Sequence, residues 1–339
     1  MHMPAFPWLR WLGGLLLAGA VCAQAAGQQA APPPRPIADW LARLQQAGSR
    51  APSYSGTYVV SSAAGTLSSA RIERYCDGGT QIERIETLTG EPRVTLRRNE
   101  TVRVYLPARR VVRSERRAPG KGEFPHLLAP GLAAAAQAFY AAEPAGHGRV
   151  AGADADIVLI KPLDEWRYGY RIWSERQTGM IVKIQTLDAQ GRVLEQSAFS
   201  ELTLHAPVRP GKLLRPMDGS AGYRPVRAER LPTTAGQEGW ALSAPVPGFA
   251  SQACYRQQMP GGREPLVQWM FSDGLATVSL FMERIDEGAA VREGVAAVGA
   301  THVLTRRMAD GPQIWWLTAV GEVPVRTLQE FAARLQPSY

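Results

Sequence analysis

The residue types that most often do chemistry are present in this chain, but their spacing forms no catalytic or metal-binding motif. Four histidines follow the N-terminal export signal described below, and none has a partner at metal-ligand spacing: His126, His147, His205 and His302. The chain has no HExxH, CxxC or GxSxG sequence and no glycine-rich phosphate loop. Because an enzyme needs preorganised groups, we expect no catalysis, no metal and no cofactor.

A basic run is the first group of residues with a binding chemistry. Between residues 97 and 121 the only acids are Glu100 and Glu115, whereas the cations are Arg97, Arg98, Arg103, Arg109, Arg110, Arg113, Arg116, Arg117 and Lys121. Guanidinium groups bind carboxylates and phosphates bidentately, so the run predicts a patch for an acidic partner or for lipid phosphates. A solvated strand face would have the same composition, and that alternative stays open.

Aromatic side chains form the second group. They are Tyr105, Phe139, Tyr168, Tyr170 and Trp173, and we expect them on the inner face of a curled sheet. A half-barrel with helices inside can leave a cavity for acyl chains, and these residues are its candidate lining. Ordinary core packing is the alternative.

Two cysteines, Cys76 and Cys254, follow the export signal. An oxidising compartment permits a disulfide between them, and closing so long a loop would stabilise the fold by up to roughly 4–5 kcal/mol. The bond would join the two domains expected below. Two separate buried thiols are the alternative, since a sequence does not show proximity.

The N-terminus is typical of an export signal. Arg10 precedes an apolar run over residues 11–22, and Ala23-Gln24-Ala25 is a small-x-small cleavage site. A retained anchor is disfavoured because a membrane span needs roughly 20 apolar residues. Cys22 lacks the leucine-rich residues that precede a lipidated cysteine. We therefore expect export to the periplasm, cleavage near Ala25 and a soluble mature protein.

Residues 166–204 are the clearest structural signal, because they indicate three strands joined by two tight turns. Tyr168, Tyr170 and Ile172 alternate with polar residues or glycine at a period of two, typical of an antiparallel sheet with one wet face. Further strands are predicted at residues 54–61, 67–75, 80–87, 93–98, 101–106, 111–115, 148–151 and 157–162. So large a sheet must curl, and helices predicted at residues 37–47 and 132–141 would fill its concavity.

Domain boundaries follow from composition. After the signal peptide, 1–25, comes a proline-rich leader, 26–36, and then the large domain, 37–204. A linker rich in proline and glycine covers 205–225, and a smaller α+β domain covers 226–339. In this domain we expect strands at 267–272, 276–284, 300–307 and 313–320, with a closing helix at 325–335. The predicted fold class is α+β, mostly antiparallel β.

The formal charge is +8, and almost all of it comes from arginine. An exported chain without a nucleic-acid motif is not expected to bind nucleic acid. A GC-rich genome explains the arginine content as well as an acidic partner or a phosphorylated lipid does.

Several segments together resemble the MucB/RseB family. In the large domain they are residues 166–173 (WRYGYRIW) and 187–196 (LDAQGRVLEQ), with Trp40-Leu41 and Tyr54-Ser55-Gly56 near the start. In the small domain they are residues 247–249 (PGF), 271–281 (FSDGLATVSLF) and 320–324 (VGEVP). Each is weak alone, but their order and spacing are specific, and they extend over nearly the whole mature chain. The two cysteines match no motif of the family.

The resemblance implies a periplasmic negative regulator of the envelope-stress sigma factor. Its large domain would be a half-open barrel over helices, similar to lipoprotein carriers. It would bind the periplasmic segment of a transmembrane anti-sigma factor and shield that segment from proteolysis. Lipopolysaccharide or lipoprotein acyl chains would displace it, and homo-oligomerisation stays open.

Two rival functions remain. The large-domain architecture alone fits a periplasmic lipoprotein or lipid carrier, although a second domain of this size argues against a simple carrier. An envelope enzyme such as a hydrolase would need a nucleophile and a base that the fold, and not the sequence order, brings together.

Overall fold

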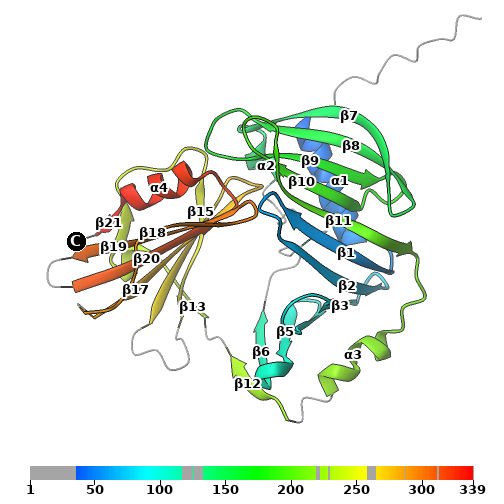
Figure 1. Ribbon diagram of the computed structural model, residues 1–339, viewed down its shortest axis with the longest axis horizontal. Coiled ribbons are helices and arrows are strands. Elements are labelled where there is room, and N and C mark those ends of the chain that lie inside the picture. Colours follow the sequence, from blue (N-terminus) through cyan, green and yellow to red (C-terminus); the bar gives the residue numbers. More distant parts are fainter. Residues whose placement is uncertain are drawn as a thin grey trace, which may run out of the picture. The chain divides into compact units, whose positions relative to one another are not determined.

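The computed structural model describes residues 36–116, 124, 133–218, 222–227, 230–257, 265–286, 288–310 and 313–338. Their strands form a twelve-stranded sheet, a seven-stranded sheet and a short two-stranded sheet (Figure 1). The predicted signal peptide, its cleavage site and all of the leader but Pro36 lie outside these residues. No described helix is both long and apolar enough to cross a membrane.

The large sheet has the strand order β12-β6-β5-β4-β3-β2-β1-β11-β10-β9-β8-β7. Neighbouring strands are antiparallel except β12 and β6, which are parallel. The bounds are β1 Tyr54–Ser62, β2 Leu67–Cys76, β3 Gln81–Thr87, β4 Val94–Arg98, β5 Thr101–Leu106, β6 Val111–Arg116, β7 Tyr140–Val150, β8 Ala153–Pro162, β9 Gly169–Glu175, β10 Ile181–Leu187, β11 Val193–Leu204 and β12 Arg224–Arg227. A 3₁₀ turn, η1 (Pro107–Arg109), joins β5 to β6.

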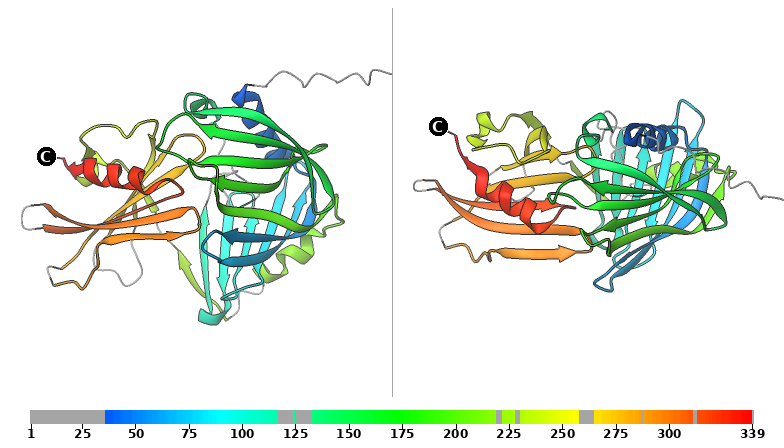
Figure 2. Two further views of the ribbon diagram at one scale, coloured as in Figure 1. Left: turned by 45° about the horizontal axis from the view of Figure 1, so that its top comes forward. Right: turned by 90° about the horizontal axis from the view of Figure 1, so that it is seen from above.

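Helix α1 (Ile37–Arg50) packs on the concave face of this sheet (Figure 2). Its apolar stripe of Ile37, Trp40, Leu41 and Leu44 is buried among residues of β8 and β9. The helix continues through Gly48, where we expected it to end. Pro52 ends it instead, because the residue before a proline avoids the helical conformation, and Ala51 is extended with ψ 134°.

The predicted helix at 132–141 is wrong beyond its first turn. Helix α2 covers only Ala133–Ala136, and β7 begins at Tyr140. Tyr140 is buried against Tyr170, and its backbone pairs with Pro162, so tertiary packing overrides the helical tendency of the alanines. Strand β7 also contains Pro144, which is tolerated because β7 is the end strand and bulges between Pro144 and His147.

The segment predicted as a linker, 205–225, contains regular structure. Helix α3 (Pro210–Asp218) contacts β3 and β4 and buries Leu213. Arg224 and Pro225 already belong to β12, which adds to the large sheet beside β6. The large sheet therefore continues past residue 204, and the division of the chain into two domains stays a prediction.

The seven-stranded sheet has the order β13-β15-β16-β17-β20-β19-β18. Helix α4 (Val325–Arg334) contacts β19 and β20 and buries Leu328 and Phe331 in the core with Phe271 (Figure 1). The bounds are β13 Arg230–Thr233, β14 Trp240–Leu242, β15 Ala250–Gln257, β16 Leu266–Ser272, β17 Thr277–Arg284, β18 Gly294–Val298, β19 Thr301–Asp310, β20 Gln313–Gly321 and β21 Leu335–Pro337. Turn η2 (Gly236–Glu238) precedes β14, which pairs with β21.

The predicted fold class is confirmed: the described structure is mostly antiparallel β with few helices. Among the described strands the large sheet stays open, because its end strands β12 and β7 do not pair. Its concave face, with α1 against it, positions the candidate site.

Candidate functional site

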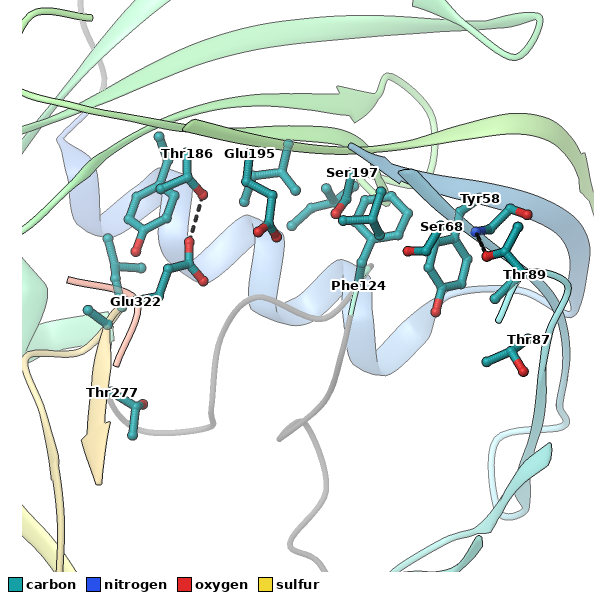
Figure 3. A pocket seen from close by; sticks show the side chains of 18 of the residues that line it. Tyr58, Ser68, Thr87, Thr89, Phe124, Thr186, Glu195, Ser197, Thr277 and Glu322 are labelled. Atoms are coloured by element: carbon teal, nitrogen blue, oxygen red, sulfur yellow. Dashed lines mark hydrogen bonds between the residues drawn. The ribbon is translucent and has the colours of Figure 1, made fainter. Parts of the chain in front are cut away.

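A cavity of about 640 Å³ lies between the concave face of the large sheet and two turns of the small sheet (Figure 3). The large sheet supplies most of its wall, from strands β1, β2, β3, β9, β10 and β11. The described residues that line it are Tyr58, Val60, Ser68, Ser69, Ala70, Thr87, Thr89, Arg93, Phe124, Tyr170, Ile181, Ile184, Thr186, Glu195, Ser197, Leu275, Ala276, Thr277 and Glu322.

The strand register explains why these side chains share one face. Thr186 of β10 lies opposite Glu195 of β11 on one side and Tyr170 of β9 on the other. Directly opposed residues of antiparallel strands point to the same face, so all three enter the cavity. The residues immediately before and after each of these three point to the opposite face of the sheet.

The small sheet contributes the turn between β16 and β17 and the residues after β20. In the first turn, Asp273 accepts hydrogen bonds from the backbone N–H groups of Leu275 (2.9 Å) and Ala276 (2.8 Å). Gly274 has φ +107°, a conformation that L side chains rarely adopt. The turn is therefore held in one shape, and it presents Leu275, Ala276 and Thr277 to the cavity.

Arg167 fastens this turn to the large sheet. Its side chain is fully buried and donates to Asp273 Oδ2 (2.9 Å), Asp164 Oδ1 (2.8 Å) and the Pro247 carbonyl oxygen (2.9 Å). The Tyr140 hydroxyl donates to the same Asp273 oxygen at 2.8 Å. Burial raises the pKa of Asp273, while its hydrogen bonds and the Arg167 charge act in the opposite direction.

Aromatic rings and a glycine complete the surroundings of Arg167. Its guanidinium carbon lies 4.5 Å from the ring centre of Phe139 and 5.2 Å from that of Phe249. Gly248 has φ +78°, and a Cβ atom there would collide with the guanidinium group. Any larger residue at position 248 would therefore disturb the ion pair.

Two carboxylates mark one end of the cavity. Glu322 accepts a hydrogen bond of 2.6 Å from the Thr186 hydroxyl, and Glu195 accepts one of 3.2 Å from the Ala300 backbone. Burial raises the pKa of Glu322 to about 7, and the charge of Glu195 adds to this. Burial also raises the pKa of Tyr168 to about 12, with further effects of Asp188 and Glu322.

Of the five aromatic residues predicted to line a lipid cavity, the structure places only Tyr170 in this one. Phe139 packs on Arg167, and Tyr168 lies beside His302. Trp173 follows a concave-face residue, so it points to the opposite face and lies 4.5 Å from the Lys183 ammonium group. Tyr105 belongs to a separate apolar cluster with Leu96, Val112 and Tyr223.

The predicted arginine patch is divided between the two faces of the sheet. Arg103 lies opposite Leu96 and therefore on that residue's face, whereas Arg97 lies opposite Val102 on the other face. Arg113 shares the face of Arg97, and Arg98 shares that of Arg103. Arg109 pairs with Glu91 at 3.4 Å, and Arg110 is an exposed turn residue. The side chain of Arg116, together with Arg117 and Lys121, lies outside the described residues.

Cys76 and Cys254 are both free thiols, so the predicted disulfide is not formed in this structure. Cys76 ends β2 of the large sheet, and Cys254 is buried in β15 of the small sheet. Burial raises the pKa of the Cys254 thiol to about 11. Among the described residues, no group of three or more histidine, cysteine or acidic side chains is placed to hold a metal ion.

The residues that join the sheets and mark the acidic end were not among the predicted site residues: Tyr140, Arg167, Thr186, Glu195, Asp273 and Glu322. Asp273 lies between the strands predicted at 267–272 and 276–284, and Glu195 and Glu322 stand in the sequence as isolated acids. Their partners lie more than 100 residues away in the chain, as in the Arg167–Asp273 and Thr186–Glu322 contacts. No local spacing reports such a contact.

Comparison with known proteins gives the chain a family. Residues 36–217 match the MucB/RseB N-terminal domain, and residues 234–336 match the MucB/RseB C-terminal domain. The sigma factor AlgU regulatory protein MucB of Pseudomonas aeruginosa is 29% identical over 333 residues, which cover 95% of this chain and 96% of that protein. The sigma-E factor regulatory protein RseB of Haemophilus influenzae is 26% identical and covers 56% of this chain and 58% of its own length.

Solved structures agree. The P. aeruginosa MucA/MucB complex contains a chain that superposes with a TM-score of 0.69 at 26% identity and covers 89% of this chain and 99% of its own. MucB in complex with MucA(peri) gives a TM-score of 0.66 at 25% identity, with the same coverage. The resemblance seen in the sequence is therefore confirmed, and this chain belongs to the MucB/RseB family of sigma factor regulatory proteins.

Proposed function

We propose that this protein is a periplasmic regulator that binds the periplasmic segment of a transmembrane anti-sigma factor and shields it from regulated proteolysis. Lipid or lipoprotein acyl chains would release that segment. The observation that carries the proposal is the match of both domains to MucB/RseB, together with the superposition on MucB in complex with MucA(peri). The relatives are regulatory proteins, so the proposal assigns no catalysis to this chain.

The cavity supports the lipid half of the proposal. It has about 640 Å³ of space, within the usual range of small-molecule sites, and apolar side chains such as Tyr58, Phe124 and Ile184 line part of it. An acyl chain entering from the large sheet would touch Leu275 and Ala276 of the small sheet. Lipid in this cavity would therefore contact residues at the place where the small sheet meets the large sheet.

The edge of the small sheet supports the peptide half. Strand β18 is an edge strand of the seven-stranded sheet, and all five of its residues are exposed. The exposed fraction is 49% for Val295 and 66% for Val298. An exposed strand edge can pair with an extended peptide through main-chain hydrogen bonds. We propose that the anti-sigma segment docks on the small domain by this edge and extends toward residues 205–225.

A capture experiment tests the proposal. The exported protein would be immobilised and offered the periplasmic segment of the host's anti-sigma factor, with a scrambled segment as the control. We expect retention of the native segment, release by added lipopolysaccharide, and weaker retention by Val295→Lys. Failure to retain the native segment would contradict the regulator proposal.

The same experiment addresses the carrier alternative, which the cavity also fits. A carrier would keep lipid through purification and pass it to an acceptor, and it would not need the anti-sigma segment. Lipid retention with no capture of the segment would therefore favour a lipoprotein or lipid carrier.

A further inference from the structure

The cavity has three chemically different regions. Tyr58, Val60 and Phe124 form an aromatic and aliphatic wall, while Glu195 and Glu322 lie together with Thr186 at one end (Figure 3). Hydroxyl groups of Ser68, Thr87 and Thr89 line the opposite end. An amphiphile with one polar group matches this arrangement better than a wholly apolar ligand does.

The polar end is acidic and lacks an internal counter-ion among the described residues. Neither Glu195 nor Glu322 forms an ion pair there, and their hydrogen-bond donors are the neutral Thr186 hydroxyl and the Ala300 backbone N–H. The described cation that lines the cavity is Arg93. Its backbone N–H donates to the Thr87 hydroxyl, which places it at the opposite end.

The fold keeps these two acids close to each other although the position of Glu322 has an energetic cost. Thr186 lies directly opposite Glu195 in the strand pairing and donates to Glu322, so both acids reach the same end of the cavity. Gly299 has φ +62°, and a Cβ atom there would collide with the Glu195 carboxylate. The raised pKa of Glu322 records the cost of burial and of the neighbouring acid. A cation entering this end would offset both effects.

We propose that the cavity binds an amphiphile whose polar group is a primary amine or another ammonium group, with its hydrocarbon chain along the Tyr58–Phe124 wall. This deepens the proposed lipid-sensing function by naming the chemical class of the polar group, and it rests on that function for its biological role. An ammonium group would donate to both carboxylates. A phosphate in the same place would meet two like charges, and a neutral alcohol would leave the acids without a counter-ion.

A head-group series in the unaltered protein tests the proposal. Dodecylamine, dodecyl phosphate and dodecanol share one chain length, so differences in affinity report the polar group. Binding would be measured by isothermal titration calorimetry below the micelle concentration of each compound, at pH 8 and physiological salt. We expect dodecylamine to bind at least tenfold more tightly than either of the others. Equal binding of the three, tighter phosphate binding or no binding would overturn the inference.

Variants locate the preference. We expect Glu322→Gln and Glu195→Gln each to reduce the amine preference and the double variant to remove it, while the affinity for dodecanol stays within about threefold. Glu283→Gln is the matched control, because Glu283 is exposed on β17 and does not line the cavity. An amine preference that survives in the folded double variant would show that the amine binds elsewhere.

Capture of the anti-sigma segment on the same preparation separates this inference from the proposed function. If the segment is captured and released by lipopolysaccharide but the amine preference is absent, the head-group inference fails and the regulator proposal stands. If the amine preference is present and the segment is not captured, the cavity assignment stands and the regulator proposal fails.

Discussion

At the scale of single residues, the Arg167–Asp273 ion pair connects the turn between β16 and β17 to the loop that precedes β9. Both side chains are fully buried. The Tyr140 hydroxyl and the Ala276 backbone N–H donate to Asp273, and Arg167 also donates to Asp164. Burying two charges costs several kcal/mol for each ion, so the pair does not by itself stabilise the fold strongly. Its loss on one side is costly, because the remaining charge stays buried without a partner.

We predict that Arg167→Ala lowers the free energy of unfolding by about 3–5 kcal/mol, because it leaves Asp273 as an uncompensated buried charge. The measurement is equilibrium urea unfolding followed by circular dichroism. Arg176→Ala is the matched control: Arg176 pairs with Asp156 at 3.0 Å, but its side chain is 46% exposed. The control should cost only about 0–1 kcal/mol. Similar losses for the two variants would contradict the importance of the buried pair.

Glu322 gives a pH-dependent prediction. Its pKa in the folded protein is about 7, above the ordinary value of 4.5, so the folded state holds its proton more tightly than the unfolded state does. The stabilising effect of this proton is complete below about pH 4.5 and is lost as the pH rises through 7. We predict that the free energy of unfolding of Glu322→Gln, relative to the unaltered protein, increases by roughly 1–3 kcal/mol between pH 4.5 and pH 8.

Other titratable groups face Glu322, so the comparison is made between the variant and the unaltered protein and not on one protein alone. These groups are Glu195, Tyr168, Tyr170 and His302, which bonds the carbonyl of the adjacent Val323. They are common to both proteins, and thermal unfolding across the pH range measures the difference. A difference that does not change with pH would show that Glu322 keeps an ordinary pKa.

At the scale of elements, the sequence predicts what local pattern controls. Apart from β7, the predicted strands of the large sheet and the amphipathic helices α1 and α4 are found within a few residues of their expected positions. Helix α3 was not predicted, since Pro210 lies in the segment expected to be a linker, and of β7 only the end was predicted, as a strand at 148–151. Pro144 is tolerated by an end strand, and Pro210 begins a helix whose Leu213 packs against the large sheet.

The candidate site was predictable only in part, for the same physical reason. Alternation correctly placed Tyr170 on the inner face, but it did not show which inner residues surround empty space and which pack in a core. Glu195 and Glu322 lie close together only because the folded chain brings β11 next to the residues that follow β20. Such long-range contacts depend on the fold of the whole chain and leave no local sequence pattern.

Helix α1 allows a test of the concave core. Leu41 is fully buried among α1, β8 and β9, whereas Leu67 on β2 is 65% exposed. We predict that Leu41→Ala lowers the free energy of unfolding by about 2–5 kcal/mol, because it leaves a cavity in the packed core. Leu67→Ala is the same chemical change at an exposed site and should cost less than about 0.5 kcal/mol. Urea unfolding of the two variants under identical conditions measures both losses. Equal losses would contradict the prediction that Leu41 is packed in the core.

At the scale of the whole molecule, the cavity wall and the joint between the sheets share one turn. Asp273 is fastened by Arg167, and its neighbours Leu275 and Ala276 line the cavity. Glu322 likewise joins Thr186 of the large sheet and faces the same space. A ligand in the cavity therefore contacts the residues that fix the small sheet to the large one, and this is the physical route by which lipid would affect a peptide on the small domain.

Linkage makes this route testable, because two ligands that weaken each other must do so by the same factor. We predict that saturating amphiphile weakens binding of the anti-sigma segment by roughly 5–150-fold, and that the saturating segment weakens the amphiphile equally. Titration calorimetry in both orders measures the two factors. Glu322→Gln, which keeps a hydrogen-bonding group but removes the charge beside Thr186, should reduce both factors together, whereas the exposed control Glu283→Gln should change neither. Lipid that binds without weakening the segment would contradict the release mechanism, because a ligand with equal affinity for both states shifts no equilibrium.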